Sequence, residues 1–420
     1  MAHTAHHTLP FEARIKHGAK HILAHDRARA QKLMKGLHPH GPMAGLCMRD
    51  IFHHHHGGSS GAPPSEPPQP APVPPAGDPQ AANDSIDVTD AGVTYTMPVG
   101  VGNPPTQYTL LIDTGSSNTW VGADKEYKPT STSHSTRNQV IVTYGSGSFT
   151  GTEYEDKVSL GGNLVIQKQS IGVASKATGF QGVDGILGIG PVGLTVGTVH
   201  NTRAVPTITD NLFQQKVIPT ESIGISFNPT TANGSINGEL TFGGTDLSHY
   251  SKDVNYVPIT KTSPASHYWG IDQTISYGKD MPILKSRAGI VDTGTTLLMI
   301  ASDAFKAYEK ATGATMDNTT GLLTVTQEQF KKMQSLYFEI GSTAYELIPN
   351  AQIWPRALND MLGGEADKIY LIVADMGSNS GSGLDFINGF GFLQRFYSVY
   401  DTTNNRVGLA NTPSTMATTN

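Results

Sequence analysis

The chain has 420 residues, a formal net charge of −6 at neutral pH, and only 15% charged residues. This length is sufficient for two substantial lobes. The sequence contains no apolar run of 18 residues or more, so no membrane-spanning helix is expected. The 46 glycines, together with many serines and threonines, favour short strands joined by turns over a mainly helical fold.

Charge is distributed unevenly along the chain. Residues 1–56 contain eight Lys and Arg against three acidic residues, a net charge of +5, which leaves −11 for the rest. The same segment holds 12 of the 16 histidines. A basic arm can bind nucleic acid, but a basic segment that covers an acidic cleft explains the opposite charges better. The first residues, Met1–Thr4, lack the apolar core of a signal peptide.

Two further features lie in this segment. Cys47 is the only cysteine, so no disulfide can form within the chain. His53–His56 is a run of four histidines, which is more typical of a flexible tract than of a metal site, and no metal is expected.

Residues 57–80 contain nine of the 26 prolines and are expected to form an exposed, easily cleaved linker. We therefore expect three parts: an N-terminal arm with its linker (1–82), an N-terminal lobe (83–254) and a C-terminal lobe (255–420). If the arm is removed near residues 81–86, the remaining protein contains no cysteine.

Within the lobes, residues 108–112, 139–144 and 368–373 have strand-like patterns. Helix-like patterns are fewer and cover residues 303–312, 327–337 and 351–362.

The tripeptide Asp-Thr-Gly occurs twice, at Asp113 and Asp292, which are 179 positions apart. Each copy follows two aliphatic residues, which predicts a buried strand that ends in a tight turn. Such a turn taken alone would be an ordinary Asx-turn. Two copies a lobe-length apart predict instead that each lobe supplies one carboxylate to a shared site.

The residues after each aspartate are suited to holding it. Thr114 and Thr293 could hydrogen-bond from one turn to the other, while Ser116 and Thr295 place a hydroxyl within reach of each carboxylate. Two adjacent carboxylates cannot easily both be ionised, so they share a proton. Such a pair can activate water against a peptide carbonyl without a metal, and it works best in acid.

A hairpin tip is predicted at residues 142–148, where Tyr144 is followed by Gly145 and Gly147 on either side of Ser146. It could close over a bound peptide or be a surface hairpin whose tyrosine packs into the core. The paired aspartates favour the first interpretation.

Together with the paired aspartates and this hairpin, further motifs extend the pattern over residues 85–412. They are Trp120 after the first aspartate, and residues 185–190, 240–244, 268–271 and 400–410. With these motifs the sequence resembles the pepsin-like (A1) aspartic proteases, and in the lack of cysteine over residues 85–412 it is most similar to the fungal secreted members.

This resemblance implies an all-β, bilobal acid-protease fold, in which two similar β-barrel-like lobes enclose a central cleft. It implies an aspartic endopeptidase made as a zymogen, with a water activated between Asp113 and Asp292. The flap and substrate-binding residues would be Tyr144, Gly145, Ser146, Gly115, Gly294 and Thr295, supported by Thr114, Thr293, Ser116 and Trp120, whose indole would bond the Tyr144 hydroxyl.

The expected partners are polypeptide substrates, the protein's own arm as an intramolecular inhibitor, and pepstatin-type inhibitors. No cofactor, nucleic acid or membrane is expected, and the protein should be a monomer. Secretion is expected, with the vacuole as the alternative, and the glycosylation candidates are Asn83, Asn233 and Asn318.

Three departures from the family pattern bear on activity. Ser146 stands where some fungal members carry Asp, which predicts a hydrophobic or aromatic preference at the scissile bond. Asn388 replaces an aliphatic residue, and Phe390 replaces an Asp thought to influence the pH range, so a mildly acidic optimum is expected.

Two alternatives remain open on the sequence alone. The same fold can serve as a binding protein that has lost activity, although the aspartates and the flap tyrosine are intact here. Nucleic-acid binding would require the basic arm to stay attached.

Overall fold

The computed structural model describes residues 6–15, 22–35, 93–145, 147–229, 231–232 and 235–419. Several sequence predictions therefore lie outside the described residues. They concern Cys47, the His53–His56 run, the linker 57–80, Asn83, Ser146 and Asn233.

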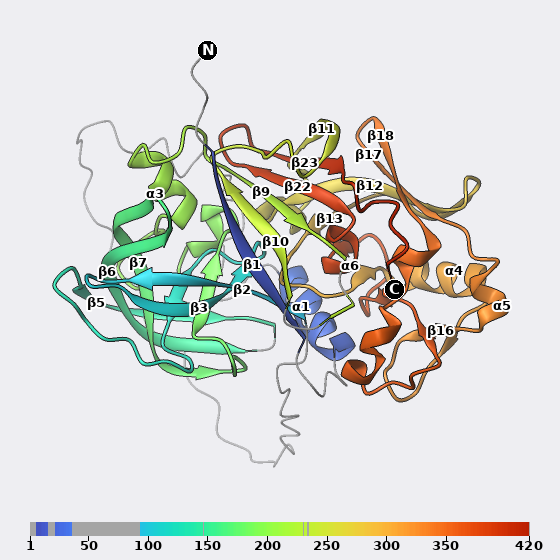
Figure 1. Ribbon diagram of the computed structural model, residues 1–420, viewed down its shortest axis with the longest axis horizontal. Coiled ribbons are helices and arrows are strands. Elements are labelled where there is room, and N and C mark those ends of the chain that lie inside the picture. Colours follow the sequence, from blue (N-terminus) through green and yellow to red (C-terminus); the bar gives the residue numbers. More distant parts are fainter. Residues whose placement is uncertain are drawn as a thin grey trace, which may run out of the picture.

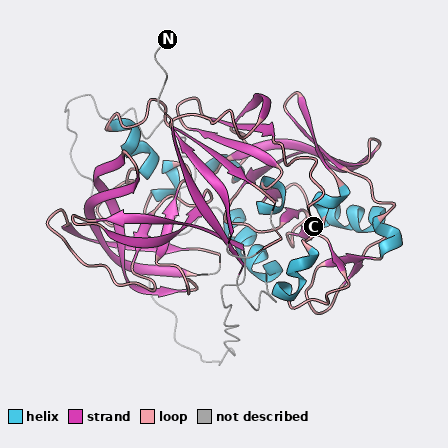
Figure 2. Ribbon diagram, in the orientation of Figure 1, coloured by secondary structure: helices cyan, strands magenta, loops and turns pink. Residues whose placement is uncertain are grey.

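Strands dominate the molecule, as Figure 2 shows. The largest sheet has 13 strands in the order β11-β23-β22-β9-β10-β1-β2-β3-β8-β4-β7-β6-β5. Its members are β1 (His7–Ile15), β2 (Val93–Val101), β3 (Thr106–Asp113), β4 (Thr119–Val121), β5 (His134–Thr143), β6 (Ser148–Gly161), β7 (Leu164–Thr178), β8 (Gly185–Gly188), β9 (Ser222–Phe227), β10 (Ser235–Phe242), β11 (Ser251–Pro258), β22 (Phe396–Asp401) and β23 (Arg406–Asn411).

A second sheet, of seven strands, belongs to the C-terminal half and has the order β18-β17-β12-β13-β21-β14-β20. It comprises β12 (Gly270–Tyr277), β13 (Met281–Val291), β14 (Leu298–Ile300), β17 (Leu336–Ile340), β18 (Thr343–Leu347), β20 (Val373–Asp375) and β21 (Phe386–Asn388). A small sheet contains β15 (Thr315–Met316), β16 (Leu323–Val325) and β19 (Ile369–Tyr370).

The described helices are short. The α-helices are α1 (Ile22–Lys35), α3 (Ile208–Gln214), α4 (Ser302–Thr312), α5 (Gln327–Phe330) and α6 (Phe390–Leu393). The 3-10 helices are η1 (Val192–Thr195), η2 (Ala265–His267), η3 (Pro349–Gln352) and η4 (Arg356–Leu362). None of the helices in the described ranges is long and apolar enough to cross a membrane.

The predicted helix at 303–312 is confirmed as α4, which ends where Gly313 takes a φ of 68°. The prediction at 327–337 is wrong in its second half, because α5 stops at Phe330 and β17 begins at Leu336. The pattern at 351–362 is divided between η3 and η4, with Pro355 between them.

The two copies of Asp-Thr-Gly lie in equivalent strand arrangements, one in each half of the molecule. In the N-terminal half β3 runs parallel to β8, with Asp113 opposite Gly188, and β4 is antiparallel to β8. In the C-terminal half β13 runs parallel to β21, with Val291 opposite Asn388, and β14 is antiparallel to β21. Each half thus brings one Asp-Thr-Gly turn to the end of a buried strand.

The N-terminal arm contributes to both the sheet and the interior. Strand β1 lies between β10 and β2, antiparallel to both, and α1 lies between the two halves of the molecule (Figure 1). Phe11 is 2% exposed and packs edge-on against Tyr95 and Phe227, with ring centroids 5.8 and 5.1 Å away. Burying such a ring contributes about 2–3 kcal/mol, so the arm is anchored by apolar packing as well as by charge.

Candidate active site

The two Asp-Thr-Gly turns meet and are joined by reciprocal hydrogen bonds. Asp113 ends β3, Asp292 follows β13, and both carboxylates are fully buried. The backbone N–H of Thr114 donates to Thr293 Oγ1 over 3.0 Å, and the N–H of Thr293 donates to Thr114 Oγ1 over 2.9 Å. The exchange joins the halves directly beneath the carboxylates and fixes their relative position.

Each carboxylate is also held by its own turn. Ser116 Oγ donates to Asp113 Oδ2 over 2.5 Å, and Thr295 Oγ1 donates to Asp292 Oδ2 over 2.6 Å. The backbone N–H groups of Gly115 and Gly294 donate to the other oxygen of the same aspartates, over 2.9 and 3.1 Å.

Glycine is required next to each aspartate because the opposite carboxylate is so close. A Cβ placed on Gly115 would stand 2.7 Å from Asp292 Oδ1, and one on Gly294 would stand 2.6 Å from Asp113 Oδ1. No side chain could therefore be accommodated at either position without moving a carboxylate.

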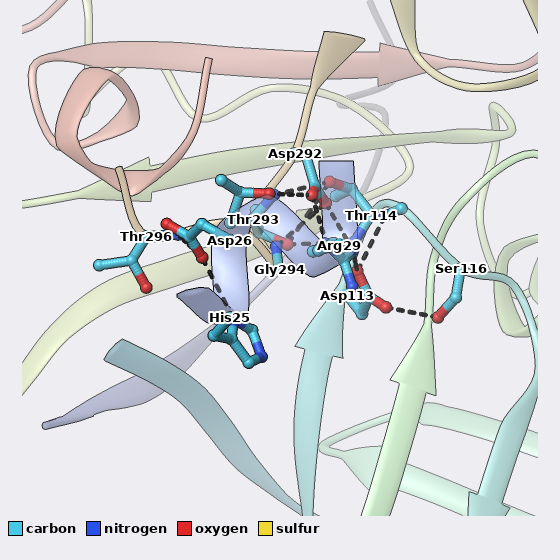
Figure 3. Close-up of polar contacts among 12 residues, drawn as sticks. His25, Asp26, Arg29, Asp113, Thr114, Ser116, Asp292, Thr293, Gly294 and Thr296 are labelled. Carbon is cyan, nitrogen blue, oxygen red and sulfur yellow. Dashed lines mark hydrogen bonds and ion pairs between the residues drawn. The ribbon is translucent and has the colours of Figure 1, made fainter. Parts of the chain in front are cut away.

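The guanidinium of Arg29, from α1, lies between the two carboxylates, as Figure 3 shows. Its Nη2 donates to Asp113 Oδ1 over 2.6 Å and to Asp292 Oδ1 over 2.9 Å, while Nε donates to Asp292 Oδ2 over 2.7 Å. Arg29 is 8% exposed, so these charge-assisted bonds form away from water. One arm residue thus satisfies both aspartates at once.

This arrangement changes the ionisation of the groups involved. Burial opposes a charge on Arg29, but the two carboxylates outweigh it and raise the pKa of Arg29. Burial would raise the pKa of Asp292, yet the charge and hydrogen bonds of Arg29 hold that pKa below its ordinary value. Burial and the neighbouring Arg29 lower the pKa of Lys32 to about 8.

A second arm residue, Asp26, binds the backbone just beyond the second aspartate. The buried Asp26 carboxylate accepts the N–H groups of Thr296, over 3.1 Å, and Leu297, over 2.8 Å. His25 Nδ1 lies 3.2 Å from the same carboxylate (Figure 3).

Further contacts hold the remainder of α1. Arg27 binds Asp375 at the end of β20, where Nη2 lies 3.1 Å from Oδ2. Tyr268 donates its hydroxyl to the backbone oxygen of Leu33 over 3.5 Å. The helix is therefore fixed along its length to the C-terminal half.

The predicted flap hairpin is formed by β5 and β6, with Thr143 opposite Ser148. Trp120 Nε1 donates to the Tyr144 hydroxyl over 2.9 Å, the bond that the sequence resemblance implied. Lys32 Nζ lies 5.7 Å from the centre of the Tyr144 ring. A Cβ on Gly145 would come within 2.6 Å of the Arg29 backbone nitrogen, so the hairpin tip rests on α1.

A possible cation site lies elsewhere in the described residues. Glu239, Asp246 and His249 place one ligand atom each within 4.8 Å of one another. His249 Nε2 and Glu239 Oε2 are within hydrogen-bonding distance, at 2.6 Å, while Ser248 donates to Asp246. These groups lie on β10 and the loop after it, away from the paired aspartates.

Of the glycosylation candidates, Asn318 is exposed.

The structure thus brings together Asp113, Asp292, the residues that follow them, Trp120 and Tyr144. Sequence reasoning did not single out Arg29, Asp26, Arg27 or Asp375. Arg29 was one of eight basic residues in the arm, and nothing in its spacing distinguishes it from the others. Only the course of the arm through the fold selects it.

Comparisons with known proteins agree with this geometry. Residues 94–412 match the family described as Eukaryotic aspartyl protease. Polyporopepsin of Irpex lacteus is 63% identical over 338 residues, which cover 80% of this chain and 99% of that protein. Cathepsin E of Rattus norvegicus is 33% identical over 345 residues, covering 75% of this chain and 79% of that protein.

A solved structure, the crystal structure of aspartic proteinase from Irpex lacteus, superposes with a TM-score of 0.76 at 63% sequence identity. The match covers 78% of this chain and 96% of the crystallised chain.

Proposed function

The chain belongs to the eukaryotic aspartyl protease family and is an aspartic endopeptidase, and from this premise we propose that Asp113 and Asp292 are its catalytic dyad. The observation that carries the assignment is the joined pair of turns, in which both buried carboxylates are held by equivalent hydroxyls and amides. Polypeptides are its substrates, and no metal takes part.

The dyad acts on a water held between the two carboxylates. One aspartate accepts a proton from that water while the other donates a proton to the oxygen of the scissile carbonyl. The tetrahedral diol then collapses and the amine leaves. Because the dyad titrates as a coupled pair, its proton belongs to the pair and not to one residue.

Residues 1–82 are the inhibitor of this dyad. The guanidinium of Arg29 occupies the position where the water would be activated, and β1 and α1 bind across both halves. The 338-residue match with polyporopepsin spans nearly all of that protein but only 80% of this chain, which is consistent with an active enzyme lacking the arm. Cleavage near residues 81–86 would leave lobes at 83–254 and 255–420.

In acid the arm should be released, because protonation of its carboxylate partners removes the attraction. Tyr144, Gly145 and Ser146 then close over a peptide in contact with Gly115, Gly294 and Thr295.

Further parts of the proposal rest on sequence. They are a preference for hydrophobic or aromatic residues at the scissile bond, a mildly acidic optimum, sensitivity to pepstatin-type inhibitors, a monomeric state, and secretion with the vacuole as the alternative compartment. Asn83, Asn233 and Asn318 are the candidate glycosylation sites.

The test is hydrolysis of denatured haemoglobin at acid pH by protein from which the arm has been removed. Asp113→Asn and Asp292→Asn should each abolish pepstatin-sensitive hydrolysis without lowering the melting temperature below that of the wild type. If wild-type protein without its arm cleaves nothing, the chain is a binding protein on this fold.

A further inference from the structure

Arg27 of α1 binds Asp375, a carboxylate of the C-terminal half. Its Nε donates to the backbone oxygen of Asp375 over 2.8 Å, and Nη2 donates to Asp375 Oδ2 over 3.1 Å. The helix that carries Arg27 also places Arg29 on the dyad. A cation of the arm, on the same helix that covers the two aspartates, is therefore bound by a carboxylate of the C-terminal half.

The Asp375 carboxylate is held in place by the protein and not by Arg27 alone. Its Oδ1 accepts the Ser302 hydroxyl over 2.5 Å and the Gly377 N–H over 2.8 Å. These bonds hold the carboxylate through Oδ1 and leave Oδ2 for the cation of Arg27. A group already held in this way loses little freedom when a cation binds.

The strand pairing and α1 together relate the position of Asp375 to that of the two aspartates. The chain passes from Asp292 to Thr296 and Leu297, whose N–H groups bind Asp26, and then enters β14. Residue Ile300 of β14 is opposite Asp375 of β20. Arg27 and Arg29 are two positions apart on α1, where Cα atoms lie about 5–6 Å apart and long side chains diverge, so Asp375 lies about two to four residues of an extended peptide away from the reacting bond.

We propose that Asp375 forms a cation subsite of the substrate cleft, which favours Lys or Arg two to four residues from the scissile bond. This inference rests on the proposed function, because the subsite becomes available only when α1 leaves the cleft. It is separate from the flap, where Ser146 offers no carboxylate, and gives the enzyme a basic preference away from the bond that it cuts.

The expected size of the preference is modest. The side chains of Arg27 and Asp375 are 35% and 22% exposed, so solvent screens their attraction. We expect a two- to fivefold higher kcat/KM for a peptide with Arg at this position than for one with Gln, falling toward equality in 1 M salt.

The test uses peptides with one apolar scissile pair and Gln at five positions on either side, each replaced in turn by Arg. Wild type without its arm should favour Arg at one position or at two neighbouring ones. Asp375→Asn should remove that preference, so that its kcat/KM for the Arg peptide falls to the value that the same variant shows for the all-Gln peptide. Asparagine keeps an oxygen for Ser302 and Gly377, so the variant should also retain the wild-type melting temperature.

Asp303→Asn is the matched control. Asp303 lies at the start of α4 beside Ser302 and accepts the N–H and hydroxyl of Ser380, so the same substitution alters a nearby carboxylate. This variant should keep the Arg preference.

Equal hydrolysis of Arg and Gln peptides at every position by the wild type would overturn the cation subsite, as would an Arg preference that survives in Asp375→Asn. If the all-Gln peptide is not cut by the wild type in a pepstatin-sensitive reaction, the proposed function fails and the subsite with it. The all-Gln reference peptide therefore separates the two failures.

Discussion

Arg29 and Asp292 form a bidentate ion pair, in which Arg29 Nε lies 2.7 Å from Asp292 Oδ2 and Arg29 Nη2 lies 2.9 Å from Asp292 Oδ1. Nη2 also donates to Asp113, so the same group binds both aspartates. A planar guanidinium suits this geometry because its donors are arranged as a fixed fork. In the described structure Arg29 therefore blocks the two aspartates through specific hydrogen bonds as well as by filling the space between them.

Substitution of Arg29 should weaken the arm. Arg29→Gln leaves two buried carboxylates without their cation, and breaking a buried pair in this way typically costs about 3–5 kcal/mol. At pH 5.5 the full-length variant should lose its arm at least 100 times faster than the wild type, measured by mass spectrometry over time. Arg27→Gln, at a part-exposed pair, should change the rate by less than tenfold. Equal rates for all three proteins would contradict the role of Arg29.

Asp292 gives the arm a dependence on pH. With the arm in place its pKa lies below the ordinary 3.8, so the closed state binds fewer protons than the released state. This contribution is complete above pH 3.8 and is lost as the pH falls through the lowered value. Pulsed hydrogen exchange of α1 should therefore show increasing exposure as the pH falls below 4. Protection of α1 that is unchanged between pH 6 and pH 3 would contradict this linkage.

Lys32 contributes in the opposite direction. Its pKa falls from 10.5 to about 8 when it is buried beside Arg29, so its charged form opposes closure and the cost disappears as the pH rises from 8 to 10.5. Lys32→Met keeps the apolar stem and removes the charge. This variant should release its arm about tenfold more slowly than the wild type at pH 5.5. Faster release would show that the contact of Lys32 with Tyr144 matters more than its desolvation.

The Trp120–Tyr144 bond should matter for turnover. Tyr144→Phe removes the acceptor of the buried indole N–H and frees the flap from its anchor, at a cost of about 1–3 kcal/mol. We expect kcat/KM of the arm-free enzyme to fall by about tenfold or more, with the melting temperature changed by only a few degrees. Wild-type kcat/KM in this variant would argue against the flap assignment.

The sequence departure at Asn388 has a structural explanation. Asn388 Nδ2 donates to Gln273 Oε1 over 2.9 Å, and Gln273 Nε2 donates to Asn388 Oδ1 over 3.1 Å, with both side chains buried. At the repeat-related position of the N-terminal half stands the buried Leu187. A reciprocal amide pair thus occupies a place where the other half has an aliphatic side chain.

Breaking this pair on one side should destabilise the fold. Asn388→Leu leaves a buried amide unpaired, at about 1–3 kcal/mol, whereas Gln273→Leu combined with Asn388→Leu removes both polar groups. Urea unfolding should show the single variant to be clearly less stable and the double variant to recover most of the loss. If the double variant loses as much free energy of unfolding as the Asn388→Leu and Gln273→Leu single variants together, the two amides act independently.

The strands and the turns that carry Asp113 and Asp292 could be predicted because their signals are local. An aliphatic pair before Asp-Thr-Gly specifies a buried strand and a turn, and β3 and β13 end at the expected residues. The helical pattern at 327–337 was misleading, because the residues after Phe330 complete a turn and enter β17, where Leu336 pairs within a sheet. Tertiary pairing overrode the local pattern there.

The contacts of the arm could not be predicted from sequence. The excess of positive charge indicated that the arm covers an acidic cleft, but Arg29 reaches the dyad only because β1 and α1 follow one path across both halves. The Arg27–Asp375 pair joins residues 348 positions apart and depends on that same path. Contacts between residues so far apart in the sequence cannot be predicted from the local pattern of residues.

The most direct test of the account compares the intact wild type with Asp292→Asn after exposure to acid. N-terminal sequencing over time should show the wild type shortened to a product that begins near residues 81–86 as pepstatin-sensitive hydrolysis appears. The variant should remain at 420 residues and inactive. Self-shortening and turnover by Asp292→Asn at the wild-type rate would contradict the dyad, and full activity of the wild type with its arm still attached would contradict the inhibitory role of Arg29.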